Sequence, residues 1–477
     1  MIILGTNSVK DTGFDVANSV RMNRGDSPSF TRSIGSNGDF NNSTLSMWVK
    51  KCSNDIDTNR LWLEFENGTN YEEVRFLDND TLRIYSESGG GTYFEIKTNR
   101  KFRDTSAFYH ICVIYDYSQA TNTNRIKLFI NGVQETSFST FSVPNQGANS
   151  SMNKSGNTVY VGAYPTGSNY FDGYLAEMVW LDGTSASVTD FGEFDEDSGI
   201  WKPINVSGLT AGTNGWYMDY ESSGSLGNDV FGSNNFTVNN LTAIDQSTDT
   251  CTNNFATLNP LAGRNNPNAY YTTFSEGNLK LVGNSSTNNG NAFSTMGFNS
   301  GKWYCEVKMV DADNSLFPIV GVITEAEIVS ANSPSNSGQI GTTIAGTVGY
   351  SPDGQKIVAG TESSYGNTFT NNDIIGIAID CDNGAVYFSK NGTFQASGDP
   401  TSGASKTGAA LTFTPSKTYF FGASVYKDTN DIEFNFGSPT FAISSGNTDG
   451  NGFGNFEYAV PTGYLSLNTK NLAVVLA

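Results

Sequence analysis

Short runs of alternating apolar and polar residues, separated by Gly and Asn, constrain the fold of this chain more than any other feature. Examples are LSMWVKK (45–51), TYFEIKT (92–98) and RIKLFING (125–132). Successive side chains of a β-strand point to opposite faces, so this period predicts strands with one buried face. Many short strands at such spacing are typical of antiparallel sandwiches. The pattern therefore predicts an all-β protein.

Length and composition indicate more than one sandwich. The chain has 477 residues, only 16% of them charged, and 13% aromatic residues suited to packing across strands. A polar stretch rich in Gly, Asn and Thr interrupts the strand pattern near the middle. We expect an antiparallel jelly-roll sandwich in residues 1–204, an ordered polar connector in 205–258, and a second sandwich with a C-terminal tail in 259–477.

The charge balance makes nucleic acid an unexpected partner. Lys and Arg number 27 against 47 Asp and Glu, a net charge of −20, and no basic patch is evident. The opening MIILGTNSVK has an apolar run of only four residues, and no run approaches 18. We therefore expect neither a signal peptide nor membrane insertion. Five cysteines without a CxxC pair indicate no disulfide framework, and Cys112 and Cys305 fit buried thiols.

The segment DIIGIAIDCDNGAVYFSKNG (373–392) raises the question of a metal site, since Asp373, Asp380 and Asp382 lie close together. An EF-hand loop needs a further spacing residue and a distal Glu, and both are missing. The acids instead fall at predicted strand ends, where carboxylates cap turn amides. The two Asn-Gly pairs predict tight turns. The same interpretation holds for the shorter NRIKLFINGVQ (124–134), and no metal site is predicted.

Candidate catalytic residues lack the context that catalysis requires. His110 is the only histidine, and no nucleophile motif accompanies it, so we interpret it as structural. The acids of Glu193–Asp197 approach the spacing of a glucanase carboxylate set, but the terminal Glu is missing. Glu196 is expected to face the core. We predict no catalytic residues and no enzyme activity.

The first half resembles a known family. The order SMWVK, FYHICVIYD, KLFINGV, VYVGA and FDGYLAEMVWLDG, across residues 18–185, is similar to laminin-G-like, concanavalin-A-like jelly rolls. The resemblance implies a two-sheet sandwich. Members often hold a structural calcium, for which Asp26 would be one ligand. The usual partner acid is replaced by Ala176, beside Glu177, so we expect no cofactor and at most a weak calcium site.

The second half resembles the SPRY domain over residues 278–437. The motifs are WYCEV (303–307), DIIGIAID (373–380), a strand ending in KNG (390–392), and a closing NFG (435–437). The resemblance implies a second two-sheet sandwich that serves binding.

The phrases that join and end the two sandwiches resemble a group of marine bacteriophage virion proteins. They are DQSTDTCTNNFATLNP (245–260) and GNGFGNFEYAVPTGYLSLNTKNL (450–472). This resemblance implies a virion surface protein in a tail fibre, head fibre or capsid decoration, present as a homo-oligomer or in several copies beside other virion structural proteins. Attachment to a host glycan or protein is the first hypothesis. A purely architectural cement protein and a glycan-cleaving enzyme are the alternatives.

Loop aromatics are the candidate ligand-binding residues. Tyr164 and Tyr170 lie in AYPTGSNYFDG and Tyr365 in TESSYGNTF, where exposed rings could stack on sugars or dock on protein. The apolar C-terminus LAVVLA (Leu472–Ala477) is either a docking element for another virion protein or an edge strand of the second sandwich.

Overall fold

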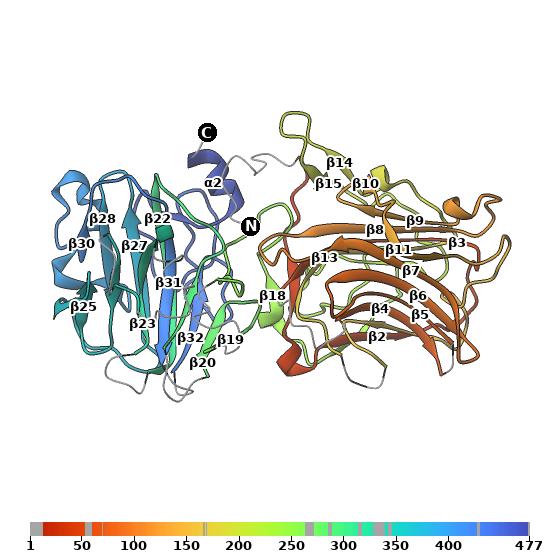
Figure 1. Ribbon diagram of the computed structural model, residues 1–477, viewed down its shortest axis with the longest axis horizontal. Helices are drawn as coiled ribbons and strands as arrows, with labels where there is room; N and C mark the ends of the chain where they lie inside the picture. Colours follow the sequence, from red (N-terminus) through yellow and green to blue (C-terminus); the bar gives the residue numbers. More distant parts are fainter. Residues whose placement is uncertain are drawn as a thin grey trace. The chain divides into compact units, whose positions relative to one another are not determined.

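The computed structural model describes residues 13–475 except 53–59, 69, 166, 168, 263–270, 285–288, 313–316, 327, 329–338, 342–345 and 427–429, and it leaves the side chains of 60–65 undescribed. The chain divides into two compact units, Asp11–Asn253 and Asn254–Ala477 (Figure 1). Each unit is built almost entirely from antiparallel sheets, which confirms the predicted all-β class with two sandwiches.

The first sheet of the N-terminal unit follows the order β10-β9-β8-β3-β13-β1-β18, and β16 also pairs with β13. The bounds are β1 Ser19–Met22, β3 Asn42–Lys51, β8 Tyr109–Asp116, β9 Ile126–Ile130, β10 Val133–Gln134, β13 Gly173–Asp182, β16 Trp216–Met218 and β18 Gln246–Ser247.

The second sheet of this unit follows the order β11-β7-β6-β5-β4-β12-β2-β17. The bounds are β2 Ser29–Ser33, β4 Arg60–Asn67, β5 Asn70–Phe76, β6 Thr81–Ser88, β7 Gly91–Lys101, β11 Phe138–Ser142, β12 Thr158–Val161 and β17 Thr237–Asn239. A separate hairpin is formed by β14 (Gly192–Phe194) and β15 (Trp201–Pro203). The 3-10 turns are η2 Arg24–Asp26, η3 Asn122–Asn124, η4 Val188–Asp190 and η5 Ala243–Asp245.

The two sheets enclose one apolar core, and the alternation seen in the sequence explains it. Met47 and Ile111 from the first sheet belong to the same buried cluster as Ile84 and Ile96 from the second. Each of these side chains is at most 1% exposed, and burial of an aliphatic side chain of this size stabilises by roughly 1.5–3 kcal/mol.

Residues 205–253, within the segment expected to be a connector, are part of the N-terminal unit. β16 pairs with β13, β17 with β2, and β18 with β1. Trp216, Tyr220 and Phe236 join its buried core. The aromatic side chains of this segment therefore complete the first sandwich.

The C-terminal unit holds a nine-stranded sheet, β19-β20-β32-β22-β27-β28-β29 with β30 beside β28 and β33 beside β22, and a six-stranded sheet, β21-β31-β23-β24-β25-β26. The bounds are β19 Thr272–Ser275, β20 Lys280–Gly283, β21 Asn289–Phe293, β22 Lys302–Ala312, β23 Ile319–Thr324, β24 Val348–Tyr350, β25 Gln355–Val358, β26 Thr361–Ser364, β27 Ile374–Asp380, β28 Ala385–Lys390, β29 Thr393–Phe394, β30 Leu411–Thr412, β31 Tyr419–Tyr426, β32 Asn430–Asn435 and β33 Leu465–Ser466. The remaining elements are η6 Gln395–Ser397, η7 Pro400–Ser405 and α2 Thr469–Val475.

The beginning and the end of the C-terminal unit lie against each other. Phe255 bridges to Asn468, and the N–H of Ala256 donates to the carbonyl of Leu467 at 2.9 Å. Leu472, in α2, is fully buried. The expectation of an edge strand at the C-terminus is therefore wrong for the described residues up to 475, because they form a helix whose buried face belongs to this unit.

The two Asn-Gly pairs form the predicted tight turns. Asn131 and Gly132 have φ of 48° and 76°, and Asn391 and Gly392 have φ of 48° and 77°. Positive φ at both central positions is the geometry of a type I′ hairpin turn, which suits the twist of the strands. An aromatic ring covers each glycine: a Cβ would meet Trp201 at 2.2 Å and Tyr458 at 2.6 Å, respectively. Only glycine fits either position.

The asparagines of these turns make the same pair of hydrogen bonds in both units. Asn131 donates its N–H to the His110 carbonyl at 2.9 Å and accepts the His110 N–H on its side chain at 2.7 Å. Asn391 does the same with Ile374, at 2.8 Å each. Asn391 also donates to Asp373 Oδ1 at 2.7 Å. The sequence echo therefore corresponds to one structural device used twice.

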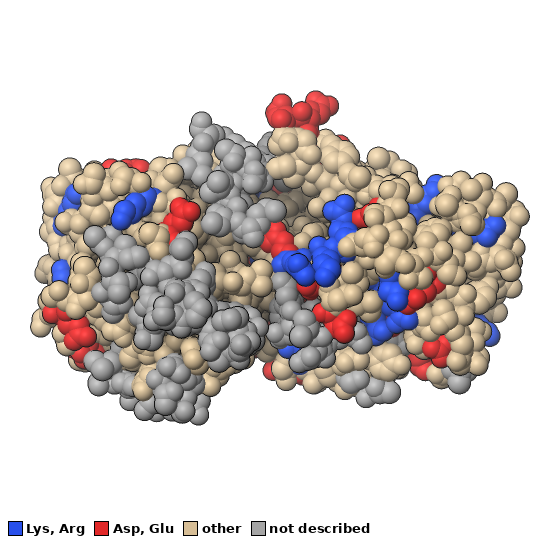
Figure 2. Space-filling model, in the orientation of Figure 1, with Lys and Arg blue, Asp and Glu red and all other residues tan. Residues whose placement is uncertain are grey.

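Lys and Arg side chains gather over β5, β6 and β7 of the N-terminal unit, interleaved with acids (Figure 2). Glu73 pairs with Arg75 at 2.9 Å and with Arg83 at 3.1 Å, while Glu95 pairs with Arg83 at 2.9 Å and Lys97 at 3.2 Å. Because Glu73 and Glu95 pair with these bases, the group is a network of ion pairs across adjacent strands. No described helix is both long and apolar enough to cross a membrane.

Candidate functional site

The predicted tyrosines belong to both units. Tyr164 and Tyr170 share the turn after β12, where both are partly buried and the Tyr164 carbonyl accepts the Gly167 N–H at 2.9 Å. Tyr365 belongs to the C-terminal unit and is only 9% exposed. Its ring packs edge-on against Tyr350, at 5.7 Å between centroids. The expectation that Tyr365 is an exposed loop residue is therefore wrong, because neighbouring aromatic rings cover it.

His110 is fully buried on β8 and occupies a defined tautomer. Trp201 Nε1–H donates to His110 Nδ1 at 3.0 Å, so the ring proton is on Nε2, which lies 2.9 Å from Ser46 Oγ. Burial lowers the pKa of His110 from 6.5 to about 3. The ring is a neutral hydrogen-bonded link between Ser46 and Trp201, as its predicted structural role requires.

The acids at the end of β27 cap turn amides, as predicted. Asp380 Oδ1 accepts the N–H groups of Asp382 at 3.0 Å and Asn383 at 2.9 Å, and its Oδ2 lies 3.0 Å from Lys302 Nζ. Burial acts to raise the pKa of Asp380, but the Asn383 hydrogen bonds and Lys302 outweigh it and lower the pKa. Asp382 in turn accepts the N–H of Gly301 at 2.7 Å.

The acids of Glu193–Asp197 stabilise the β14–β15 hairpin. Lys202 Nζ lies 3.4 Å from Glu193 Oε1 and 3.5 Å from Asp195 Oδ2. Asp195 Oδ1 also accepts the Ser198 N–H at 2.9 Å. Glu196 is exposed, contrary to expectation, because β14 ends at Phe194 and the following residues turn.

The residues implied for a calcium site have other interactions. Asp26, in η2, accepts a hydrogen bond from the Asn23 side chain at 2.9 Å. Glu177 is buried at a β-bulge of β13, where it accepts the Tyr217 hydroxyl at 2.6 Å. Burial raises the pKa of Glu177 to about 8. In the described part of the chain no three His, Cys, Asp or Glu side chains are grouped to hold a metal. A partly protonated, buried carboxyl is a poor ligand for calcium.

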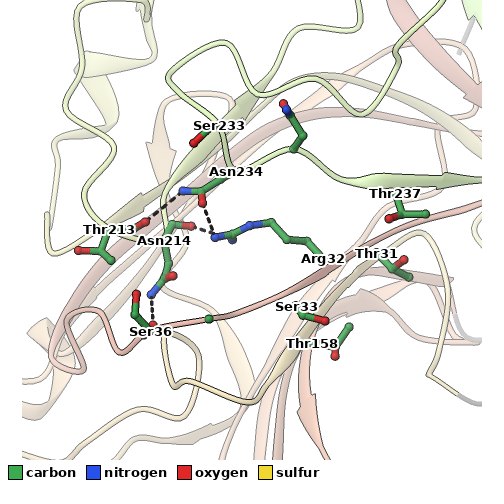
Figure 3. Close-up of a pocket in the computed structure, with 12 residues that line it drawn as sticks. Thr31, Arg32, Ser33, Ser36, Thr158, Thr213, Asn214, Ser233, Asn234 and Thr237 are labelled. Carbon is green, nitrogen blue, oxygen red and sulfur yellow. Dashed lines mark hydrogen bonds between the residues drawn. The ribbon is translucent and has the colours of Figure 1, made fainter.

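A polar pocket of about 480 Å³, here called the Arg32 pocket, lies at the end of β2 (Figure 3). Its described lining consists of Thr, Ser, Asn and Gly with one charged residue, Arg32. β17 pairs with β2 only up to the Thr237–Thr31 pair, so Arg32 lies beyond the last pairing of these two strands. The Arg32 side chain extends from there toward Asn214 and Asn234 (Figure 3).

Two asparagines fix the Arg32 guanidinium. Nη1 donates to the Asn214 carbonyl at 3.2 Å, and Nη2 donates to Asn234 Oδ1 at 2.6 Å. Burial lowers the pKa of Arg32, while the charges of Asp229 and Asp182 act to raise it. Those two carboxylates accept backbone N–H groups of the same asparagines, at 2.9 Å and 2.8 Å. The pocket therefore has a braced polar frame around a cation.

A second pocket, of about 440 Å³, is called the Tyr93 pocket. It is lined by strand residues of β4–β7 together with residues of 37–40 and 149–157. Glu72 in its wall is 3% exposed, and its Oε1 accepts the Ser150 hydroxyl at 3.0 Å and the Ser151 N–H at 2.9 Å. Burial raises the pKa of Glu72, and the Ser151 and Ser150 hydrogen bonds offset part of that effect. Glu72 Oε2 and Asn157 Oδ1 are buried atoms without a hydrogen-bond partner in the described structure.

Tyr93 gives this pocket an exposed aromatic ring. Its side chain is 40% exposed, and burial of part of the ring together with the charge of Glu72 raises its pKa. Glu87, also in the lining, accepts hydroxyl hydrogen bonds from Tyr71 at 3.0 Å and Tyr85 at 3.2 Å. An aromatic face beside amides, hydroxyls and carboxylates matches a ligand with both C–H faces and hydroxyl groups.

Neither pocket was predicted from the sequence. A signal existed for Tyr93. In TYFEIKT the residues Phe94 and Ile96 take the core face, which leaves Tyr93 on the other face. No local signal marks Arg32, because segments far apart in the chain line its pocket.

Comparison with known proteins gives one family match in the N-terminal unit and another in the C-terminal unit. Residues 25–185 match the family model of the concanavalin A-like lectin/glucanases superfamily, and residues 302–439 match the SPRY domain. The two expected domains are thereby confirmed. No curated protein sequence matches the chain.

Solved structures with local similarity include the SPRY domain of human HERC1, with 16% identity over 33% of this chain and 87% of that chain and a TM-score of 0.26. A human SPRY domain shows 16% identity over 36% and 98%, with a TM-score of 0.26. A native heptameric SAP-like pentraxin from Limulus polyphemus shows 12% identity over 36% and 80%, with a TM-score of 0.28. These scores are too low to bear on function.

Proposed function

We propose that this chain is a non-enzymatic binding protein that recognises a glycan through the Tyr93 pocket of its concanavalin A-like domain. The observation that carries the proposal is the Tyr93 ring, 40% exposed at a pocket otherwise lined mainly by Asn, Ser and Glu. An exposed aromatic face packs against the C–H face of a sugar, while amides and carboxylates bind its hydroxyls.

The biological setting we propose is the surface of a bacteriophage particle, where several copies would attach the particle to a host glycan. The support is the resemblance of residues 245–260 and 450–472 to marine phage virion proteins. The test is peptide mass spectrometry of gradient-purified particles of a phage that encodes this sequence. Recovery of the chain with the particles is expected; recovery only from the soluble lysate of infected cells would refute this setting.

One observation favours glycan cleavage as a second candidate. Glu72 and Glu87 line the same pocket, and burial raises the pKa of Glu72, as a general acid requires. Against it, Ser150 and Ser151 hold the Glu72 carboxyl inside the wall. A reducing-end release assay on bacterial polysaccharide separates the two: we expect no release, whereas release that Glu72→Gln abolishes would establish cleavage.

A glycan array tests the binding proposal and separates it from a purely architectural role. Wild-type protein is expected to bind a defined set of glycans, and Tyr93→Ala to lose that binding by about tenfold or more, since stacked aromatic anchors dominate such sites. Phe194→Ala is the matched control, because Phe194 is 49% exposed in the same unit and outside the pocket. Equal binding by both variants, or no binding by the wild type, would favour the architectural role.

A further inference from the structure

The Arg32 pocket holds a cation without a contacting counter-charge. Within the described structure the guanidinium donates to Asn214 O and Asn234 Oδ1, and no Asp or Glu lies within ion-pair distance of it. The charges of Asp229 and Asp182 act on Arg32 without an ion pair, and their carboxylate oxygens accept the backbone N–H groups of Asn234 and Asn214. A partly buried cation gains from a contacting anion, because burial weakens its solvation.

The guanidinium keeps donors available for such an anion. Arginine has about five N–H donors, of which two are used in these bonds. Guanidinium groups bind the paired oxygens of carboxylates and sulfates more strongly than they bind neutral acceptors.

The frame around Arg32 is preorganised. Asn214 Nδ2 donates to the Ser36 carbonyl at 3.0 Å, and Asn234 Nδ2 donates to the Thr213 carbonyl at 3.1 Å, so each asparagine ties two segments together (Figure 3). A ligand that meets a fixed guanidinium loses less free energy to ordering than one that must order it.

The rest of the lining favours a hydroxyl-rich ligand. Hydroxyl side chains come from neighbouring positions on three strands: Thr31 and Ser33 on β2, Thr158 on β12, and Thr237 on β17. Hydroxyls both donate and accept hydrogen bonds, as sugar hydroxyls do. No large apolar side chain lines the pocket among the described residues, so it offers little to the apolar side chains of a peptide.

We propose that the Arg32 pocket binds the anionic group of an acidic glycan, a carboxylate or sulfate carried on a hydroxyl-rich chain. The site is separate from the Tyr93 pocket, with which it shares no lining residue among those described. The Arg32 guanidinium binds the anionic oxygens, and the Thr and Ser hydroxyls bind the neighbouring sugar hydroxyls.

Calorimetric titration of the full chain in 0.15 M salt tests the proposal. The probes are an oligogalacturonate, a sulfated galactan oligosaccharide, a neutral galactan oligosaccharide of the same length, and a hexa-aspartate peptide. The variants are Arg32→Gln and Thr237→Val, with Arg125→Gln as matched control. Arg125 likewise donates to backbone carbonyls, of Gln119, Ala120 and Pro144, but lies outside the pocket.

Wild-type protein is expected to bind at least one anionic oligosaccharide about tenfold more tightly than the neutral one, and Arg32→Gln to remove that preference. Thr237→Val, at an exposed strand position that accepts valine, weakens binding a few-fold, and Arg125→Gln leaves it unchanged. Comparing the affinities for the oligogalacturonate and the sulfated galactan shows whether the pocket prefers a carboxylate or a sulfate. Equal affinity for neutral and anionic sugars, unchanged binding by Arg32→Gln, or hexa-aspartate binding as tight as the sugars would overturn the proposal.

Tyr93→Ala separates this proposal from the proposed function. It should leave the anionic preference intact while reducing binding of array glycans. Loss of anion binding in Tyr93→Ala, with Arg32→Gln unaffected, would assign that binding to the Tyr93 pocket and refute the Arg32 site.

Discussion

Substitution of Glu177 by Gln should change how the stability of the N-terminal unit depends on pH. Glu177 is 6% exposed in the middle of β13, with φ of 48° at a break in register. Burial raises the pKa of Glu177 to about 8; the Tyr217 hydrogen bond lowers it, and Asp219 and Glu221 raise it further. Gln has the same shape and can still accept the Tyr217 hydroxyl, but it does not titrate.

The magnitude follows from the difference between the folded and unfolded pKa. The unfolded value is the ordinary 4.5 and the folded value about 8. Between these pH values the folded state binds a proton that the unfolded state has released. The free energy of unfolding therefore falls as pH rises, by about 1.4 kcal/mol per pH unit, and the whole loss is about 5 kcal/mol above pH 8. Below pH 4.5 this group contributes no pH dependence.

Urea unfolding followed by tryptophan fluorescence measures this effect. Five of the six tryptophans, at positions 48, 62, 180, 201 and 216, belong to the N-terminal unit. Relative to wild type, Glu177→Gln should gain several kcal/mol between pH 5 and pH 9. Other buried acids, such as Glu72 and Glu73, are present in both proteins. Their contributions to the pH dependence therefore cancel when the unfolding free energy of wild type is subtracted from that of the variant. Glu193→Gln, at an exposed carboxylate, is the control. A difference that stays constant with pH would refute the reasoning.

Three further predictions test the fold. Since burial lowers the pKa of His110 to about 3, its imidazole NMR signals should show the neutral Nε2–H form without titration between pH 5 and 8; a midpoint near 6.5 would contradict this. Leu472→Ala should destabilise the C-terminal unit by about 2–4 kcal/mol in thermal unfolding, and Val474→Ala, 46% exposed, by under about 0.5 kcal/mol; equal effects would argue against the buried helix. Asp380→Asn should cost about 1–2 kcal/mol above pH 5, and the difference from wild type should shrink as pH falls through the lowered pKa of this carboxyl; a pH-independent difference would count against it.

Local patterns in the sequence were sufficient to predict the strands and their turns. Alternation on β7 places Phe94 and Ile96 in the core, and Asn131-Gly132 and Asn391-Gly392 supply the positive φ of their turns. Each of these features is decided by residues a few positions apart, which is why a single sequence reveals them.

Features that depend on distant neighbours could not be predicted in this way. Tyr365 lies in a stretch that reads as an exposed loop, yet Tyr350 and Phe388 pack against its ring. The apolar C-terminus reads equally as a strand or a docking tail. It is helical because the Asn468 carbonyl accepts the Leu472 N–H at 3.0 Å and the core of the C-terminal unit covers Leu472.

The candidate pockets also depend on residues that are distant in the sequence. The Arg32 pocket needs the loop residues Asn214 and Asn234, about two hundred positions from Arg32, to fix the guanidinium. The local sequence SFTRS around Arg32 does not indicate that these asparagines bind its side chain. Strand alternation could have predicted that Tyr93 lies on the face away from the core. It could not have predicted that Glu72 and Asn157 line the same pocket.

Glycan recognition by the Tyr93 pocket can be tested with a crystal structure of the protein bound to the glycan that binds most strongly on the array. We expect density for a sugar ring stacked on Tyr93, with its hydroxyls against the Asn and Ser side chains that line the pocket. A sugar bound instead at the turn carrying Tyr164 and Tyr170, with the Tyr93 pocket empty, would contradict it.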